Sequence, residues 1–423
     1  MKPRRLSKFI HINDTIQTVK APTSKSIGQR VLFAAALANT SSKILGINQS
    51  DDVQNILKII TQLGAEIIWE NEQITILPKK GKIAYELSVG ESGLGTRLSV
   101  PIVSHFNKNY TITGTGTLLN RPMHWFKKYL PEMGLKVQLN NNYLPIQVEG
   151  KLKGGNYTVD GNLSSQYISG LLMALPLCAE DSVLQVENAV STPYIDITIA
   201  VLAKYGISIQ NNDYLSYHIK GKQTYTPPLN TFTIEGDFSG AACWIVYGLL
   251  SKNGITIENL NPNSTQADIA ILKVVHLVGG KIKWENNTLK IIPPEVLKPF
   301  EFNAENCPDL FPVLASLAAG IQGKSTIFGT ERLRYKESDR ATVLIEEFAK
   351  LGLTIKAGDN VLKIYGEGNL NSGQINSHKD HRIAMAFAIA SLLTPHGLYI
   401  TDPECVNKSY PNFWEATIVN LKP

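Results

Sequence analysis

The sequence contains few cysteines, and they form no pattern. Only four occur among 423 residues, at Cys178, Cys243, Cys307 and Cys405. None of them forms the close pairs that zinc sites and redox motifs require, and their scatter does not suggest a disulfide framework. Three of the four lie in or beside apolar segments, so we expect buried structural thiols.

The chain also has little excess of charge of either sign. Its 41 basic and 36 acidic side chains give a net charge of +5. Nucleic-acid-binding proteins usually concentrate Lys and Arg into a dense stripe, and no such stripe is present. The mild positive balance instead favours small anionic molecules as partners, with no nucleic acid.

Long hydrophobic runs are missing as well. The longest helix-like apolar stretch, Ile383 to Leu393, is shorter than the ~20 residues needed to cross a bilayer. The basic N-terminal segment is not followed by the apolar region of a signal peptide. We therefore expect a cytoplasmic protein with no membrane partner. A chain of 423 residues with 43% hydrophobic residues predicts a globular protein of two domains.

An internal repeat of about 72 residues is present. Five segments share one pattern, in which an amphipathic helix ends in Gly and a strand, a turn rich in Asn, Asp or Gly, and a second strand follow. The helix-ending glycines, spaced 70 to 73 residues apart, are Gly64, Gly134, Gly206, Gly279 and Gly352. Glycine suits the left-handed residue that closes a helix, and Asn and Asp suit hairpin turns.

A second series of residues keeps the same spacing. Six helices rich in small apolar residues each open with a polar residue that is suited to an N-cap. These residues, 68 to 73 positions apart, are Ser24, Ser92, Ser164, Asp237, Asp309 and Asp380. Each repeat is thus predicted as strand, buried helix, strand, outer helix and hairpin.

The N-terminus is predicted to complete the last repeat. Phe9–Ile12 and Thr15–Val19 flank an Asn-Asp turn, so we expect them to form the hairpin that the sixth repeat lacks. Three repeats then form a first domain over 21–230, and three form a second domain over 1–20 plus 231–423. Pro-containing crossings at 20–22 and 226–228 fit these boundaries.

The expected helix starts also carry the residues suited to chemistry. Helix N-termini attract anions, and six of them could face a cleft between the domains. Taken singly, each motif has an ordinary explanation as a cap, a solvated charge or a buried ion pair. The motifs at or near these starts are Pro22–Ser26 with Arg30, Gly90–Gly93 with Arg97, Asn120–Pro122, Asp160–Tyr167, Ser191–Tyr194, Pro308–Asp309, Arg332–Arg340, Asp380–Arg382 and Asn407–Ser409.

Together these motifs resemble the 5-enolpyruvylshikimate-3-phosphate (EPSP) synthase family over essentially the whole chain. Seven family motifs occur in order, each at a predicted helix start. The matching residues are Lys25, Ser26 and Arg30, Arg121-Pro122, Asp160 to Gln166, Ser191 to Asp196, Arg334 to Arg340, Asp380 to Arg382, and Lys408.

The resemblance implies an α/β (α+β) fold of two domains, an inside-out α/β barrel of six βαβαββ repeats with three per domain. The active site would lie in the cleft between the domains. The implied enzyme transfers the enolpyruvyl (1-carboxyvinyl) group of phosphoenolpyruvate to the 5-hydroxyl of shikimate 3-phosphate. It releases phosphate after a tetrahedral intermediate, in aromatic amino acid biosynthesis. It would need no metal or organic cofactor, and we expect a monomer.

The resemblance also assigns roles to residues. Asp309 would be the base for the hydroxyl proton and Glu337 the acid at C3, with Lys25 in support. Shikimate 3-phosphate would be bound by Lys25, Ser26, Arg30, Ser164, Ser165, Gln166, Ser191, Tyr194, Asp309 and Lys336. Phosphoenolpyruvate would be bound by Lys25, Gly93, Arg121, Gln166, Arg340, Arg382 and Lys408.

The chain departs from the family pattern in a few places. Thr23 stands where Gly is usual, Glu91 and Leu94 where Asn and Thr are common, and Arg332 where Asn is common. A carboxylate at position 91 beside an anionic ligand is unfavourable unless it turns towards Arg97 or another cation.

Two other functions are compatible with parts of this pattern. The related enolpyruvyl transferase that acts on UDP-N-acetylglucosamine carries a Cys five residues before its Arg-Pro, where this chain has Gly116. Its Lys-Asn pair corresponds here to Lys25-Ser26. A non-catalytic repeat protein that binds an anion between its lobes is the second alternative.

Overall fold

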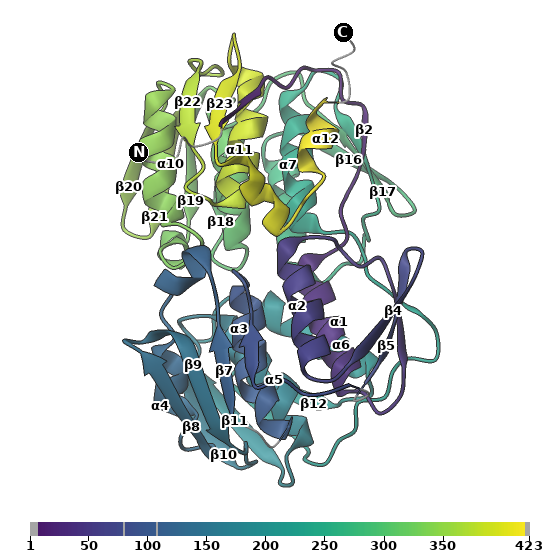
Figure 1. Ribbon diagram of the computed structural model, residues 1–423. Helices are drawn as coiled ribbons and strands as arrows, with labels where there is room; N and C mark the ends of the chain where they lie inside the picture. The colour runs from purple at the N-terminus through teal and green to yellow at the C-terminus, as the bar shows by residue number, and fades with distance from the viewer. Residues whose placement is uncertain (1–6, 79–80, 107–108, 419–423) are drawn as a thin grey trace. The chain divides into compact units, whose positions relative to one another are not determined.

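The computed structural model describes residues 7–78, 81–106 and 109–418. The chain folds into two compact units, shown in Figure 1. Unit 1 comprises Met1–Pro22 and Gly236–Pro423, and unit 2 comprises Thr23–Glu235.

Unit 2 contains six α-helices and three four-stranded sheets within its described residues. Its helices are α1 (Lys25–Leu37), α2 (Asp51–Gln62), α3 (Gly93–Val103), α4 (His124–Tyr129), α5 (Ser165–Ala174) and α6 (Pro193–Lys204). Its strands are β3 (Ser42–Leu45), β4 (Glu66–Glu70), β5 (Gln73–Leu77), β6 (Glu86–Ser88), β7 (Tyr110–Thr113), β8 (Leu135–Asn140), β9 (Tyr143–Gly150), β10 (Asn156–Asp160), β11 (Ser182–Glu187), β12 (Ile209–Asn212), β13 (Ser216–Ile219) and β14 (Phe232–Thr233). Short 3-10 helices are η1 (Ser104–Phe106), η2 (Gly116–Asn120) and η3 (Leu175–Leu177).

Unit 1 also contains six α-helices within its described residues, with two four-stranded sheets and one three-stranded sheet. Its helices are α7 (Phe238–Leu250), α8 (Ile271–Leu277), α9 (Phe311–Ala319), α10 (Arg340–Lys350), α11 (His381–Ala390) and α12 (Phe413–Ile418). Its strands are β1 (Ser7–Ile10), β2 (Thr18–Lys20), β15 (Ile255–Glu258), β16 (Lys281–Glu285), β17 (Thr288–Ile292), β18 (Glu301–Asn303), β19 (Gly323–Phe328), β20 (Thr354–Gly358), β21 (Val361–Gly366), β22 (Gly373–Asn376) and β23 (Leu398–Thr401). Its 3-10 helices are η4 (Ala267–Ala270), η5 (Pro308–Leu310), η6 (Thr330–Leu333), η7 (Ser391–Leu393) and η8 (Pro403–Lys408).

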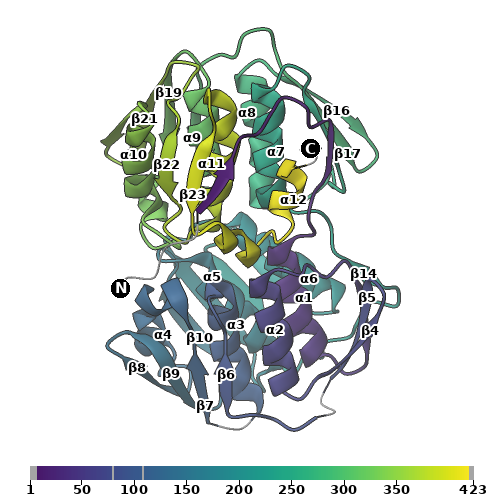
Figure 2. The ribbon, with the colours of Figure 1, turned by 45° about the horizontal axis from the view of Figure 1, so that its top comes forward.

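Among the described residues, the five four-stranded sheets share one topology, while the three-stranded sheet β1-β23-β22 has a single antiparallel strand in place of the hairpin. A parallel pair is followed by an antiparallel hairpin, as in the order β6-β7-β9-β8 of unit 2 and β18-β19-β21-β20 of unit 1. The sheets lie outside the long apolar helices of their own unit, as Figure 2 shows. In unit 1, α7, α9 and α11 pack on one another and are buried along nearly their whole length. This arrangement confirms the predicted fold class.

At each of the two points where the chain passes from one unit to the other, the last strand before the crossing stays in the sheet of the unit that the chain is leaving. β2 precedes α1 in the chain but pairs in parallel with β15, and Ala21 N donates to Glu258 O. β14 precedes α7 but pairs in parallel with β3, and Ile234 N donates to Leu45 O. The chain therefore changes unit after Pro22 and after Glu235, two and five residues beyond the expected positions.

The expected N-terminal hairpin does not form. β1 pairs antiparallel with β23, so the N-terminal segment does complete the sixth sheet. The second expected strand, Thr15–Val19, instead contributes to β2, which belongs to the β15 sheet. The prediction of a local hairpin was wrong because partners more than 200 residues away in sequence compete successfully for both strands.

The helix ends follow the local sequence closely. All five predicted helix-ending glycines have positive φ, between 75° and 94°. Ser24, Ser92, Ser164, Asp237 and Asp380 are N-caps whose side chains accept backbone N–H bonds. Asp309 is the exception, since it lies inside η5 and caps nothing. Its carboxylate therefore remains available for other partners.

Candidate active site

Each unit carries one cluster of the sequence-predicted residues, and the two clusters differ in charge. In unit 2 the cluster lies at the N-terminal ends of α1, α3, α5 and α6. Lys25 is the first residue of α1, and its Nζ lies 3.0 Å from Asp52 Oδ2 on α2. Ser92 Oγ, at the start of α3, donates to Gln29 Oε1 of α1 at 2.9 Å. The helix starts of this unit are thus tied together by side chains.

Arg30 is a buried cation with neutral partners. Only 1% of it is exposed, and it donates from Nε to Thr198 Oγ1 at 2.7 Å. It also donates from Nη1 to Ser26 O and from Nη2 to Tyr194 O. Burial lowers the pKa of Arg30 to about 10, with the nearby Tyr194 opposing the change. No carboxylate contacts Arg30 within residues 7–78, 81–106 and 109–418, so a bound anion would stabilise its charge.

A second group of cations surrounds the start of α3. Arg97 Nη1 donates to Gly93 O at 3.1 Å and to Gln166 Oε1 at 3.2 Å. Its guanidinium carbon lies 4.9 Å from the centre of the Tyr167 ring. A Cβ atom on Gly93 would lie 2.8 Å from Arg97 Nη1 and 2.9 Å from Arg121 Nη1. Two guanidinium groups thus approach the backbone of the first residue of α3, which itself points a backbone N–H outward.

Glu91 turns towards the segment that leads to Arg121. Its Oε2 accepts from Thr117 N at 3.2 Å and from Thr117 Oγ1 at 2.9 Å. A Cβ atom on Gly116 would lie 1.8 Å from Glu91 Oε1, and Gly116 has a φ of +58°. Both the position and the backbone conformation favour glycine here. Since η2 ends one residue before Arg121, Glu91 fixes the turn that carries this arginine.

The remaining predicted residues of unit 2 also lie at helix starts. Ser164 caps α5, and Ser165 and Gln166 form its first turn. Ser191 precedes α6 with a φ of +51°, and Tyr194 lies in the first turn of that helix. Ser26 lies in the first turn of α1. α5 packs against both α3 and α6, which brings these hydroxyl and amide groups to the same end of the unit.

In unit 1 the cluster is built around Asp309. Its Oδ1 lies 2.8 Å from Arg340 Nη1 and 3.3 Å from Lys336 Nζ, and its Oδ2 lies 3.7 Å from Arg382 Nη2. The carboxylate is 22% exposed. Burial alone would raise the pKa of Asp309, but these three cations hold it well below its usual range.

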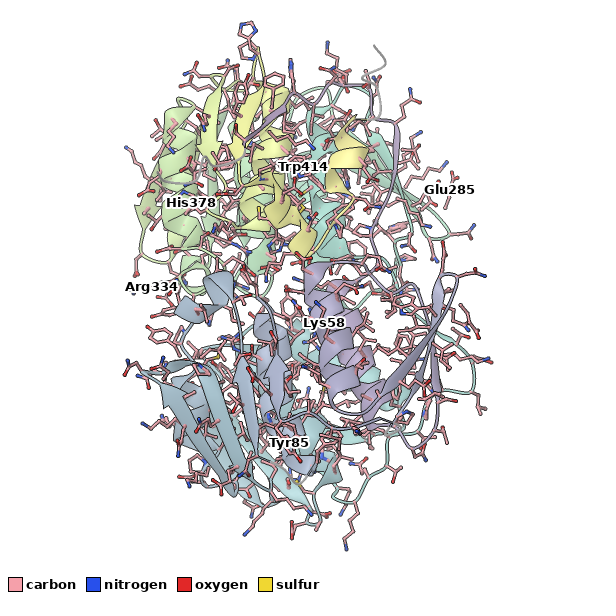
Figure 3. The ribbon with its side chains drawn as sticks, viewed as in Figure 1. Lys58, Tyr85, Glu285, Arg334, His378 and Trp414 are labelled. Atoms are coloured by element: carbon pink, nitrogen blue, oxygen red, sulfur yellow. The ribbon has the colours of Figure 1, made fainter. Side chains whose placement is uncertain are left out.

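Arg340 is held by three carboxylates. Besides Asp309, it donates from Nη2 to Glu337 Oε2 at 2.9 Å and from Nε to Asp380 Oδ2 at 2.8 Å. A further bond joins Nη2 to Asp380 Oδ1. Four of its five N–H donors are therefore engaged, and Arg340 fixes Asp309 and Glu337 with respect to each other. Arg334, at the start of the same motif, is exposed and is labelled in Figure 3.

Arg382 and Lys408 lie beside this cluster. Arg382 is in the first turn of α11 and donates from Nη1 to Ser239 O, on α7, at 2.7 Å. Lys408 ends η8, which packs against α11, and is buried. The N-terminal ends of α7 and α11 and the 3-10 helix before α9 therefore meet at Arg382 and Asp309.

The two clusters offer different chemistry. Unit 2 places cations at its helix starts with few acids, and is suited to bind anions: Lys25, Arg30, Arg97 and Arg121 against Asp52 and Glu91. Unit 1 combines acids and cations in nearly equal number, and is suited to proton transfer next to a charged group: Asp237, Asp268, Asp309, Glu337 and Asp380 with Lys336, Arg340, Arg382 and Lys408.

Sequence reasoning missed several members of these clusters. Asp52 binds Lys25, Ser239 supports Arg382, and Asp268 is a buried acid whose carboxylate lies at Ser239 Oγ. The repeat itself carried a signal for two of them. Predicted residues follow the helix-opening residue of repeats two, three, five and six by 27 to 29 positions, and Asp52 and Asp268 follow those of repeats one and four by 28 and 31.

Other chemistries find no support among the described residues. They contain no group of three or more His, Cys, Asp or Glu side chains arranged to hold a metal ion. Burial raises the pKa of the Cys178, Cys243 and Cys405 thiols to about 12, so these cysteines are poor nucleophiles. No helix in the described part of the chain is long and apolar enough to cross a membrane.

Known proteins resemble this chain along nearly its full length. A profile of the EPSP synthase (3-phosphoshikimate 1-carboxyvinyltransferase) family matches residues 11–417. A 3-phosphoshikimate 1-carboxyvinyltransferase of Clostridium kluyveri is 36% identical over 413 residues, which cover 96% of each chain. The same enzyme of a Clostridium perfringens strain is 37% identical over 403 residues, 94% of each chain.

Solved structures share the fold. An EPSP synthase structure from Acinetobacter baumannii superimposes with a TM-score of 0.78 at 24% identity, covering 97% of this chain and 96% of that one. A second structure from the same organism gives a TM-score of 0.79 at 22% identity, covering 97% of each. With the family profile, the clostridial relatives and the clustered motif residues in agreement, the chain belongs to the EPSP synthase family.

Proposed function

We propose that this protein transfers the enolpyruvyl group of phosphoenolpyruvate to the 5-hydroxyl of shikimate 3-phosphate and releases phosphate. The observation that carries the proposal is the cluster in which Arg340 holds Asp309 and Glu337 side by side, next to the cations Lys336 and Arg382. Such a cluster can move a proton beside an anion. The reaction places the enzyme in aromatic amino acid biosynthesis.

In this proposal, unit 2 supplies most of the contacts to shikimate 3-phosphate. The buried Arg30 has only neutral partners, so a phosphate or carboxylate would complete its coordination. Lys25, Ser26, Ser164, Ser165, Gln166, Ser191 and Tyr194 add hydrogen-bond donors at helix starts. Asp309 and Lys336 complete the site from unit 1.

Phosphoenolpyruvate would be bound by cations from both units. Arg121 and Gln166 reach the start of α3 at Gly93, and Arg382 and Lys408 lie at the start of α11 and the end of η8. Lys25 would contact both substrates. Arg340 has one N–H donor beyond its four bonds to carboxylates, and this donor is the one we assign to phosphoenolpyruvate. The proposal thus assigns substrate-binding residues to both units.

The chemical step requires a base and an acid. Asp309 takes the proton of the 5-hydroxyl while that oxygen adds to C2, and C3 accepts a proton and becomes a methyl group. The methyl group then loses a proton and the bond to phosphate breaks, which restores the double bond. Two groups are candidates for protonating C3, Glu337 and Lys25. The cations around Asp309 weaken it as a base in the free protein. Anionic substrates that engage Lys336 and Arg382 would raise its basicity when both substrates are bound.

The structure gives no support to the related UDP-N-acetylglucosamine enzyme. A cysteine at position 116 would place its Cβ 1.8 Å from Glu91 Oε1 and would have to adopt a φ of +58°. A cysteine here would therefore have to displace the Glu91 carboxylate from Thr117 and adopt a strained backbone conformation.

Phosphate release tests the proposal. The protein is incubated with phosphoenolpyruvate and, in parallel, with shikimate 3-phosphate, shikimate or UDP-N-acetylglucosamine. Release with shikimate 3-phosphate alone is expected. Silence with all three acceptors would overturn the proposal in favour of a non-catalytic anion-binding protein.

Two variants then test the assigned roles. Asp309→Ala and Glu337→Gln are expected to lower kcat by about 10²- to 10⁴-fold. A Glu337→Gln variant that keeps kcat within about twofold of the original would assign the C3 proton to Lys25. We also propose that the enzyme is cytoplasmic, because its substrates are phosphorylated metabolites, and that it is a monomer. Sedimentation at micromolar concentration tests the monomer.

A further inference from the structure

Asp268 is a buried acid that the proposed reaction does not use. It lies in η4, immediately before α8, and is 1% exposed. One carboxylate oxygen, Oδ2, accepts from Ser239 Oγ. The other, Oδ1, has no hydrogen-bond partner among the described residues. A buried carboxylate oxygen without a donor is costly, so its presence calls for a reason other than stability.

Ser239 links Asp268 to Arg382. It lies in the first turn of α7, where its backbone N–H donates to Asp237 Oδ1 at 2.8 Å. Its carbonyl oxygen accepts from Arg382 Nη1 at 2.7 Å. Ser239 therefore binds both groups: its side chain donates to Asp268, and its carbonyl oxygen accepts from the Arg382 guanidinium.

The surrounding turn does not need Asp268 for its own attachment. Gln266, two residues earlier, donates from Nε2 to Gly236 O at 2.7 Å and accepts at Oε1 from Phe238 N at 3.1 Å. These bonds already fix the turn to the start of α7. The carboxyl group of Asp268 is thus a separate feature, with Ser239 as its only hydrogen-bond donor among the described residues.

The charged neighbours of Asp268 come from three elements. Asp309 faces it from η5, Arg382 from α11 and Asp237 from the start of α7, while the Cys307 thiol lies before η5. Burial and the charge of Asp309 raise the pKa of Asp268 to about 7, with Asp237 adding to the rise and Ser239 and Arg382 opposing it. Below this pH the group is neutral and does not neutralise Arg382.

We propose that Asp268 is a positioning residue for phosphoenolpyruvate, which sets the Arg382 guanidinium through Ser239 and takes up a proton when the anion binds. The proposal rests on the proposed function, which gives Arg382 to phosphoenolpyruvate. Asp268 also lies close to the corresponding position of the repeat: it follows Asp237 by 31 residues, whereas repeats two, three, five and six carry assigned binding residues at offsets of 27 to 29.

The proposal predicts a specific dependence on pH. Deprotonated Asp268 adds a negative charge close to Arg382, so the affinity for phosphoenolpyruvate should fall as pH rises through about 7. Asp268→Asn keeps an acceptor for Ser239 Oγ but cannot gain this charge. At pH 8.5 its KM for phosphoenolpyruvate should therefore be about three- to tenfold lower than that of the original enzyme, because a coupling of about one pK unit corresponds to a tenfold change. At pH 6 the two should agree.

Variants that break the link test the positioning role. Asp268→Ala and Ser239→Ala each remove the hydrogen bond from one side, and each should raise the KM for phosphoenolpyruvate about tenfold with an unchanged KM for shikimate 3-phosphate. The double variant should be no worse than either single one. Asp196→Asn is the matched control, because Asp196 is a partly buried acid of unit 2 bonded by the Tyr214 hydroxyl, and it should leave the KM for phosphoenolpyruvate unchanged.

Three results would overturn the proposal. One is a KM for phosphoenolpyruvate within about twofold of the original in all variants at both pH values. Another is a parallel rise in both KM values together with a lower Tm, which would make Asp268 a structural residue only. The third is full additivity of the two alanine variants. An original enzyme that releases no phosphate with shikimate 3-phosphate would refute the proposed function instead, so the two failures are distinguishable.

Discussion

Replacing Gly93 by Ala tests the arginine pair at the start of α3. The added Cβ would lie 2.8 Å from Arg97 Nη1 and 2.9 Å from Arg121 Nη1, whereas ordinary contacts begin at 3.4 Å. Each guanidinium must therefore retreat by roughly half an ångström. Because both contacts are ends of flexible side chains and Ala favours a helix, the fold should tolerate the change.

The expected effect falls on one substrate. Displacement of this size at a binding group, by analogy with the roughly 10²-fold cost of a 1 Å misplacement, should raise the KM for phosphoenolpyruvate about ten- to a hundredfold. The KM for shikimate 3-phosphate and the Tm should stay near their original values. Phosphate release at varied concentrations of each substrate, with thermal unfolding followed by circular dichroism, measures all three quantities.

The control is Gly28→Ala in α1. A Cβ there would meet nothing closer than Ile234 Cδ1 at 3.6 Å, an ordinary contact, so both KM values should change by less than about twofold. If Gly93→Ala retained the original KM for phosphoenolpyruvate with an unchanged Tm, the assignment of this helix start to phosphoenolpyruvate would be refuted.

Two further predictions concern other parts of the molecule. Gly116→Ala would collide with the Glu91 carboxylate at a left-handed position and should cost about 1 kcal/mol or more; adding Glu91→Ala should restore part of the Tm, and no restoration would contradict the collision. Glu347, 2% exposed, accepts from Lys350 and Asn376 N and pairs with His378, labelled in Figure 3. Burial would raise its pKa, but these partners lower it below the usual 4.5. The carboxylate therefore stabilises the fold at neutral pH, and this stabilisation is lost as pH falls from 4.5 through the lowered pKa. Glu347→Gln should unfold about 1–3 kcal/mol more easily at pH 7, and the difference from the original protein in urea titrations should shrink at pH 3; a constant difference would refute the ion-pair explanation.

Much of the architecture could be predicted from local sequence. Helix caps and helix-ending glycines depend on hydrogen bonds and φ values within a few residues. Ser24, Ser92, Asp380 and Gly279 therefore take the predicted conformations. Their regular spacing was enough to predict the number and order of the repeats. Motif residues such as Lys25, Ser164 and Arg382 also lay at helix starts, whereas Asp309 lies inside η5 and Lys408 ends η8.

Only the tertiary structure decided which distant groups meet. β2 pairs with β15 and β14 pairs with β3, and in each case the two strands are more than 180 residues apart in the sequence. No local sequence signal indicates such a pairing. The sequence predicted Asp309 as a helix cap, but Pro308 begins a 3-10 helix there. Its carboxylate instead contacts three cations: Lys336 before α10, Arg340 on α10 and Arg382 on α11.

The contacts between charged side chains could not be predicted from the sequence either. Residue identity showed Arg340, Arg382 and Asp268 but not that Arg340 is held by three carboxylates, or that Asp268 reaches Arg382 through Ser239. Electrostatic energies depend on distance and burial, and packing fixes both only when helices from separate repeats come together. The sequence by itself therefore determined the repeat, the helix ends and the family, while the tertiary structure decided which of the charged residues act on one another.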